Sequence, residues 1–122
     1  PLISLIFFSC IQNFYYDDII GTWKSCDEDR CVEIIFIDEK KITISIEDIN
    51  LKKKIIKGYY IIDNSKEPDT INFEKLSGHN GKLYGIIKKI NNNTIKISKL
   101  SNSWKMRPIS IELESSLIFH KI

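Results

Sequence analysis

Alanine, the residue that most favours helices, is absent from this chain of 122 residues. Isoleucine, lysine and asparagine are abundant instead, and the β-branched side chain of isoleucine favours strands. Hydrophobic residues make up 43% of the chain and charged residues 28%, which is typical of folded proteins and unlike disordered ones. We therefore expect a folded domain built from strands.

An excess of one charge is also absent. The formal net charge is +2, and lysines alternate with acidic residues along most of the chain. The one basic run is Lys52-Lys53-Lys54 together with Lys57. We interpret it as a solvated edge that deters strand pairing, with contact to phosphate or anionic lipid as the alternative. No nucleic-acid partner is predicted.

Residues that carry chemistry are few. His79 lies in a glycine-flanked loop and His120 in the last strand-like run, and neither has a serine or cysteine marked as a nucleophile beside it. General acid–base catalysis needs a partner group and a pocket. A zinc site needs more ligands than Cys26 and Cys31, and the acidic segment 27–29 lacks the spacing and glycine of a calcium loop. We expect a protein that is not an enzyme and holds no metal or cofactor.

An apolar run occupies residues 1–9 and ends at a cysteine. It is too short to span a bilayer but suits the hydrophobic region of a signal peptide. Because an initiating methionine and a basic segment are missing, we expect that this signal peptide is truncated at its start. Ser9-Cys10 resembles the end of a bacterial lipobox. We expect lipidation of Cys10, with 10–18 as the lipidated cysteine and tether, and hence attachment to a membrane of the bacterial cell envelope, on its periplasmic or surface face. Secretion without a lipid and a cytosolic protein with an apolar N-terminal strand are the alternatives.

Export affects the interpretation of the other two cysteines. Cys26 and Cys31 flank a polar turn of four residues between two strand-like runs, so they could face each other across a hairpin. An oxidising compartment favours a disulfide between them, and two free thiols are the alternative.

The segment 19–122 reads as one all-β domain. Short apolar runs alternate with turn residues, and Ile42, Ile44 and Ile46 would share one face of a strand. Consecutive hairpins must close or leave long edges, which predicts an antiparallel up-and-down barrel of about eight strands, with a sandwich as the alternative. The candidate strands are 19–26, 31–38, 41–49, 54–63, 69–76, 82–90, 93–100, 106–113 and 116–122.

Several motifs occur in an order that resembles a known family. They are 21–24 (Gly-Thr-Trp-Lys), 60–63 (Tyr-Ile-Ile-Asp), 68–73 (Pro-Asp-Thr-Ile-Asn-Phe), 83–87 (Leu-Tyr-Gly-Ile-Ile) and 107–108 (Arg-Pro). The chain resembles the small, largely uncharacterised lipocalin-like domains that are abundant in planctomycetes and occur in other bacteria. The resemblance implies a lipocalin-like barrel whose closed end is held by a clasp of Gly21, Trp23 and Arg107, with the guanidinium packed over the indole. It brings no established activity.

The predicted function is therefore a lipid-anchored, non-catalytic binding or structural module. Inward residues that are mostly isoleucine, leucine and phenylalanine favour a largely filled interior, and so a structural or protein-binding module. We expect this module to be a monomer. The alternatives are a carrier of a small apolar ligand and an inhibitor of lysozyme or another enzyme acting through the loop 77–81. The candidate ligand or partner contacts are Tyr60, Tyr84, His79 and Trp104.

Overall fold

The computed structural model of the chain describes residues 16–65, 67–103 and 116–122. A short 3-10 helix, η1 (Asp17–Ile19), precedes eight strands in this part of the chain. The strands are β1 (Gly21–Cys26), β2 (Arg30–Phe36), β3 (Lys41–Asp48), β4 (Lys53–Asp63), β5 (Thr70–Glu74), β6 (Leu83–Asn91), β7 (Thr94–Ser98) and β8 (Ser116–Lys121). The predicted strand 106–113 lies outside the described residues.

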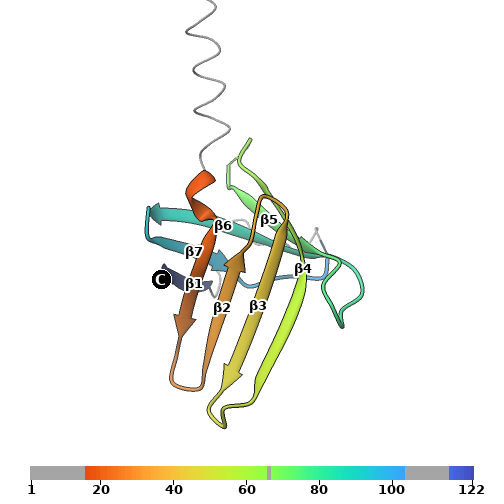
Figure 1. Cartoon of the computed structure of the whole chain (residues 1–122). Coiled ribbons are helices and arrows are strands. Elements are labelled where there is room, and N and C mark those ends of the chain that lie inside the picture. Colours follow the sequence, from red (N-terminus) through yellow and green to blue (C-terminus); the bar gives the residue numbers. More distant parts are fainter. Residues whose placement is uncertain (1–15, 66, 104–115) are drawn as a thin grey trace, which may run out of the picture.

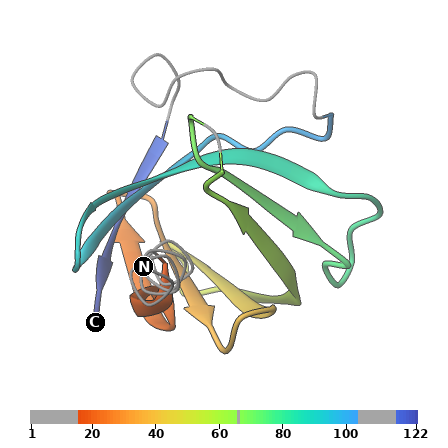
Figure 2. The ribbon, with the colours of Figure 1, turned by 90° about the horizontal axis from the view of Figure 1, so that it is seen from above.

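The strands form a closed antiparallel barrel. Each strand pairs with the next along the chain, and β8 returns to pair with β1. Figure 1 shows β1 to β4 running side by side, while β6 and β7 cross them at a steep angle, and Figure 2 shows the strands forming a ring. The all-β, up-and-down barrel predicted from the sequence is confirmed, and the alternative of a sandwich is excluded.

Aspartates start three of the tight turns that join the strands. The carboxylates of Asp27, Asp38 and Asp48 each accept hydrogen bonds from two main-chain N–H groups of the turn that follows, at 2.8–3.0 Å. Such side chains replace hydrogen bonds that the chain loses where a strand ends. These aspartates therefore help to place the turns, and with them the register of the hairpins.

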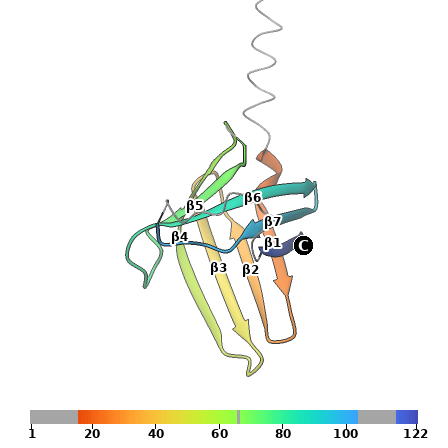
Figure 3. The same ribbon diagram turned by 180° about the vertical axis from the view of Figure 1, so that it is seen from behind.

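The barrel has two different ends. The η1 end carries the helix and the turn 37–40, and the hairpin end carries the β1–β2 turn 27–29 and the β3–β4 turn 49–52. Figure 1 shows η1 above and these two turns below, and Figure 3 shows the same order from behind. The disulfide Cys26–Cys31 closes the β1–β2 hairpin at the hairpin end, which confirms the predicted pairing.

The η1 half of the barrel is filled by large side chains. Trp23, Phe36 and Tyr60 are buried there, and the rings of Phe36 and Tyr60 meet edge to face with centroids 4.9 Å apart. Ile19 of η1 packs into the same cluster. Aromatic rings are wide enough to reach across a small barrel, so this half has a solid core.

Candidate functional site

An apolar cavity of about 560 Å³ occupies the other half of the barrel and opens at the hairpin end. Of the 16 lining residues that the structure describes, 12 are apolar. They are Val32, Ile34, Ile44, Ile46, Ile56, Phe73, Leu76, Leu83, Ile97, Leu100, Leu117 and Phe119. This volume lies in the range of small-molecule sites, and barrels of about eight strands are wide enough to hold one small ligand.

The cavity corrects the expectation of a largely filled interior. The inward positions nearest its opening are Val32, Ile46, Ile56 and Leu83. These aliphatic side chains are shorter than the rings that fill the η1 half, so they do not meet across the barrel. Alternation along the strands predicts which residues face inward, but it does not show whether opposite walls touch.

The floor of the cavity is formed by buried side chains. Ile34, Phe73 and Phe119 are 4%, 1% and 2% exposed, and they separate the cavity from the core of the η1 half. In the described part of the chain, these side chains close the cavity toward the η1 half.

The polar group deepest in the wall is already satisfied. The hydroxyl of Ser98 accepts a hydrogen bond from the main-chain N–H of Ile86 at 2.8 Å and donates to the carbonyl oxygen of Lys99 at 3.2 Å. Ser98 is also 4% exposed. The wall therefore favours an apolar guest, because a polar guest would lose its bonds to water without gaining partners.

Cations lie around the opening. Arg30 and Lys99 line the cavity at the hairpin end and are exposed. On β4, Lys54 occupies the same face as the lining residue Ile56, two positions nearer the turn. Among the described residues, none of these three cations forms an ion pair, and the opening can accept a negative group.

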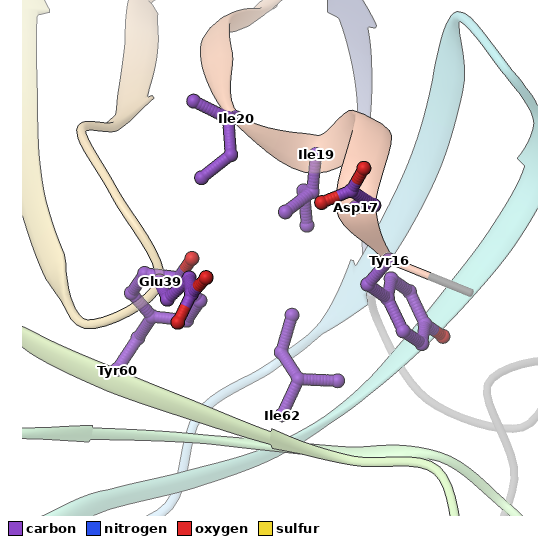
Figure 4. Close-up of a pocket in the computed structure, with 7 residues that line it drawn as sticks. All are labelled: Tyr16, Asp17, Ile19, Ile20, Glu39, Tyr60 and Ile62. Carbon is purple, nitrogen blue, oxygen red and sulfur yellow. The ribbon is translucent and has the colours of Figure 1, made fainter. Parts of the chain in front are cut away.

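A second hollow of about 360 Å³ lies at the η1 end. Figure 4 shows it between η1 and β4, with Ile19 and Ile62 on opposite sides. Its tyrosines are engaged: Tyr60 donates from its hydroxyl to the carbonyl oxygen of Asp38 at 2.6 Å, and Tyr16 donates to the carboxylate of Asp69 at 2.5 Å. This hollow is smaller than the cavity and more polar, so it is the weaker candidate for an apolar ligand.

The clasp residues Gly21 and Trp23 lie at the η1 end beside a lysine that the sequence analysis missed. The indole N–H of Trp23 donates to the carbonyl oxygen of Ile19 at 2.8 Å. The ammonium of Lys121 lies 5.6 Å from the centroid of the Trp23 ring and donates to the carbonyl oxygen of Asp18 at 2.7 Å. Lys121 therefore ties β8 to η1 at the seam of the barrel. Arg107, predicted for the place above the indole, lies outside the described residues.

The predicted contact residues do not form one site. Tyr60 lies in the core of the η1 half, Tyr84 pairs with Ser101 along β6, and His79 is exposed in the β5–β6 loop. None of these three lines the cavity. Trp104, like Cys10, lies outside the described residues. The sequence did not indicate the inward isoleucines as residues that line a site, because a filled core was expected at these positions.

Comparison with family models, with curated proteins and with solved structures found no match to this chain. In the part of the chain that the structure describes, no three histidine, cysteine or acidic side chains come together as metal ligands. The same part contains no helix whose length and apolar character would let it cross a bilayer.

Proposed function

We propose that the barrel binds a single-chain amphiphile, with an apolar chain in the cavity and an anionic head group at the opening. The observation that supports this proposal is the cavity of about 560 Å³: 12 of its 16 described lining residues are apolar, and Arg30 and Lys99 lie at its opening. A medium-chain fatty acid has this chemistry. The function is binding without catalysis, and the domain carries its ligand non-covalently.

The expected affinity follows from the apolar area that the ligand buries. Each methylene group that leaves water contributes about 0.8 kcal/mol, so ten of them contribute roughly 8 kcal/mol. Part of this is lost when ligand and side chains are immobilised. Since roughly 8 kcal/mol by itself corresponds to about 1 micromolar, we expect weaker dissociation constants, on the order of 100 micromolar, for dodecanoate.

Displacement of a dansyl-labelled undecanoic acid by dodecanoate tests the proposal. The wild-type protein should bind the probe and release it to dodecanoate. Ile46→Trp should reduce probe binding at least about 10-fold, because the larger ring occupies the cavity near its opening. Ile61→Trp is the matched control, since Ile61 is 51% exposed and outside the cavity lining. Equal binding by the two variants would show that the probe binds elsewhere.

Arg30→Gln with Lys99→Gln tests the head-group end. Dodecanoate should bind the wild type more tightly than dodecanol does, and the double variant should lose that preference while still binding dodecanol. Lys24→Gln with Lys40→Gln removes the same charge from exposed positions outside the cavity lining, and this control should keep the preference. A preference for dodecanoate that survives in the Arg30 and Lys99 variant would exclude the proposed head-group site.

An enzyme inhibitor acting through the loop 77–81 stays an untested alternative, because only the exposure of this loop supports it. Lipidation of Cys10 and a place in the cell envelope also stay predictions.

A further inference from the structure

The β3–β4 turn presents two large apolar side chains to solvent. Ile49 is 72% exposed and Leu51 is 78% exposed, which makes them two of the most exposed large hydrophobic residues in the described chain. Ile55, a little further along β4, is 55% exposed. We call Ile49, Leu51 and the lysines Lys52, Lys53 and Lys54 the β3–β4 tip.

The backbone of the tip adopts a strained conformation at Leu51, one of the two exposed apolar residues. Leu51 has φ of 61°, in the left-handed region that disfavours residues carrying a Cβ atom. Its conformation is held by Asp48, whose carboxylate accepts from the N–H groups of Asn50 at 2.9 Å and Lys52 at 3.0 Å, while its carbonyl accepts from Leu51 at 3.0 Å. Glycine would adopt this conformation without strain. The chain thus keeps a strained leucine where a glycine would fit.

Three consecutive lysines stand beside the apolar side chains. Lys52, Lys53 and Lys54 are all exposed, and the carboxylate of Asp48 is directed into the turn. Apolar residues beside several lysines match the interface of an anionic bilayer, where the former enter the acyl boundary and the latter meet phosphate groups.

The tip extends beyond its neighbours. The pairing of β4 with β5 begins at Tyr59, and Lys57 bonds to Ser77, so among the described strands residues 53–56 pair with β3 alone. Figures 1 and 3 show that the β3–β4 turn reaches further than the acidic β1–β2 turn 27–29. A flat surface would therefore meet the β3–β4 tip before the acidic turn.

We propose that the β3–β4 tip docks on anionic membranes, with Ile49 and Leu51 entering the interface and Lys52, Lys53 and Lys54 contacting lipid phosphates. The tip lies at the hairpin end, where the cavity opens, so docking brings the opening close to the bilayer. The helix η1 lies at the opposite end of the barrel from the β3–β4 tip (Figure 1). Membrane docking would be a function separate from ligand binding, and the features that support it all belong to the β3–β4 tip.

Flotation of the full chain with phosphatidylcholine vesicles, with and without phosphatidylglycerol, tests this docking. The measurement is the ratio of binding to anionic and neutral vesicles, in which a charge-independent contribution of the apolar N-terminal residues cancels. Replacing Lys52, Lys53 and Lys54 by glutamine should lower this ratio on the order of 100-fold, since each lysine near an anionic surface contributes roughly a factor of five. The control, Lys24→Gln with Lys40→Gln and Lys41→Gln, has the same net charge and should keep the wild-type ratio. An equal loss in the control would refute a local site.

Leu51→Gly separates docking from folding. It removes the strain at φ of 61° and should leave the protein at least as stable as the wild type, yet it should weaken binding to anionic vesicles several-fold. If a double variant that combines Leu51→Gly with Ile49→Ser bound anionic vesicles as tightly as the wild type does, the proposal would be overturned. Tight binding to duplex DNA that depends on the lysines and not on Ile49 or Leu51 would also overturn it, because the tip would then be a general polyanion site.

Tryptophan emission reports the depth of the tip. In Leu51→Trp, emission should shift to the blue and be quenched by brominated acyl chains in anionic vesicles, whereas Ile61→Trp should show neither change. If the side chain at position 51 stays exposed to water while the protein is bound to vesicles, the tip does not dock. Ile49 and Leu51 do not line the cavity, so the outcomes at these two positions are independent of whether the cavity binds dodecanoate, and the two proposals can fail separately.

Discussion

Single polar residues hold the turns and the η1 end of this barrel. Main-chain N–H groups that bond to the carboxylates of Asp27 and Asp38 lower the pKa of both side chains. At the η1 end, the ammonium groups of Lys89 and Lys121 bond to the carboxylate and the carbonyl oxygen of Asp18. Each contact is small, but together they fasten a one-turn helix that could not persist alone.

Tyr60 is the residue whose ionisation should affect stability at high pH. Burial, with smaller contributions from the charges of Asp38 and Glu39, raises the pKa of its hydroxyl from 10.0 to about 12. Between these two values the folded chain keeps a proton that the unfolded chain releases, so the free energy of unfolding falls as pH rises through this window. The contribution is complete below pH 10 and is lost above pH 12.

Tyr60→Phe should remove this part of the pH dependence. At neutral pH it should cost about 1 kcal/mol, because the carbonyl oxygen of Asp38 loses its donor. Urea unfolding at about pH 8 and about pH 11 measures both effects. The difference in unfolding free energy between wild type and variant should shrink at the higher pH. A constant difference would show that Tyr60 does not ionise on unfolding.

At the scale of elements, β4 determines the shape of the barrel. It is the longest of the described strands, and it pairs with β3 near the hairpin end and with β5 near the η1 end. Gly58 lies at the change of partner: a Cβ atom there would lie 3.0 Å from the carbonyl oxygen of Glu74 and 3.1 Å from the Cα of Leu76. A glycine within a strand often marks a close approach of backbone at a barrel corner, and main-chain atoms make that approach at Gly58.

Gly58→Ala should destabilise the fold more than Gly85→Ala. The new methyl group at 58 meets main chain that must shift, with an expected cost of about 1–3 kcal/mol. At 85 the nearest atom, at 2.7 Å, is the end of the Leu100 side chain, which can move into the cavity. Thermal or urea unfolding measures the order, and Gly85→Ala should also weaken dodecanoate binding. The reverse order of stability would mean that the corner at Gly58 is adaptable.

At the scale of the whole molecule, the barrel combines a solid half with a hollow half. The η1 half holds Trp23, Phe36 and Tyr60, and the hairpin half holds the cavity. Ligand binding needs a rigid frame and an empty space, and this division supplies both. An empty apolar cavity also costs stability, which a ligand that fills it restores.

Dodecanoate should therefore stabilise the whole fold. At 100 times its dissociation constant, a ligand that binds only the native state raises the free energy of unfolding by about 2.7 kcal/mol. Thermal unfolding at increasing dodecanoate concentrations measures the effect. Ile46→Trp should abolish it, and Ile61→Trp should not. Stabilisation that is the same in both variants would place the ligand outside the cavity.

The sequence by itself determined the class of the fold. Alternating isoleucines, turn residues at short intervals and the absence of alanine predicted a closed antiparallel sheet, because strand period and turn chemistry are local properties. The disulfide Cys26–Cys31 was predictable for the same reason, since the two cysteines face each other across one hairpin. Trp23 is buried in the η1 half, and the sequence did not indicate its neighbouring cation, Lys121, because this lysine comes from the far end of the chain.

Only the tertiary structure decided where the barrel is empty. Whether Ile46 meets a side chain from the opposite wall depends on the tilt and spacing of all the strands, which no local pattern encodes. The exposure of Leu51 is likewise a consequence of how far β3 and β4 extend beyond the other strands. Inward and outward faces follow from the strand period alone, whereas a cavity and a protruding tip arise from distances between segments that are remote in the sequence.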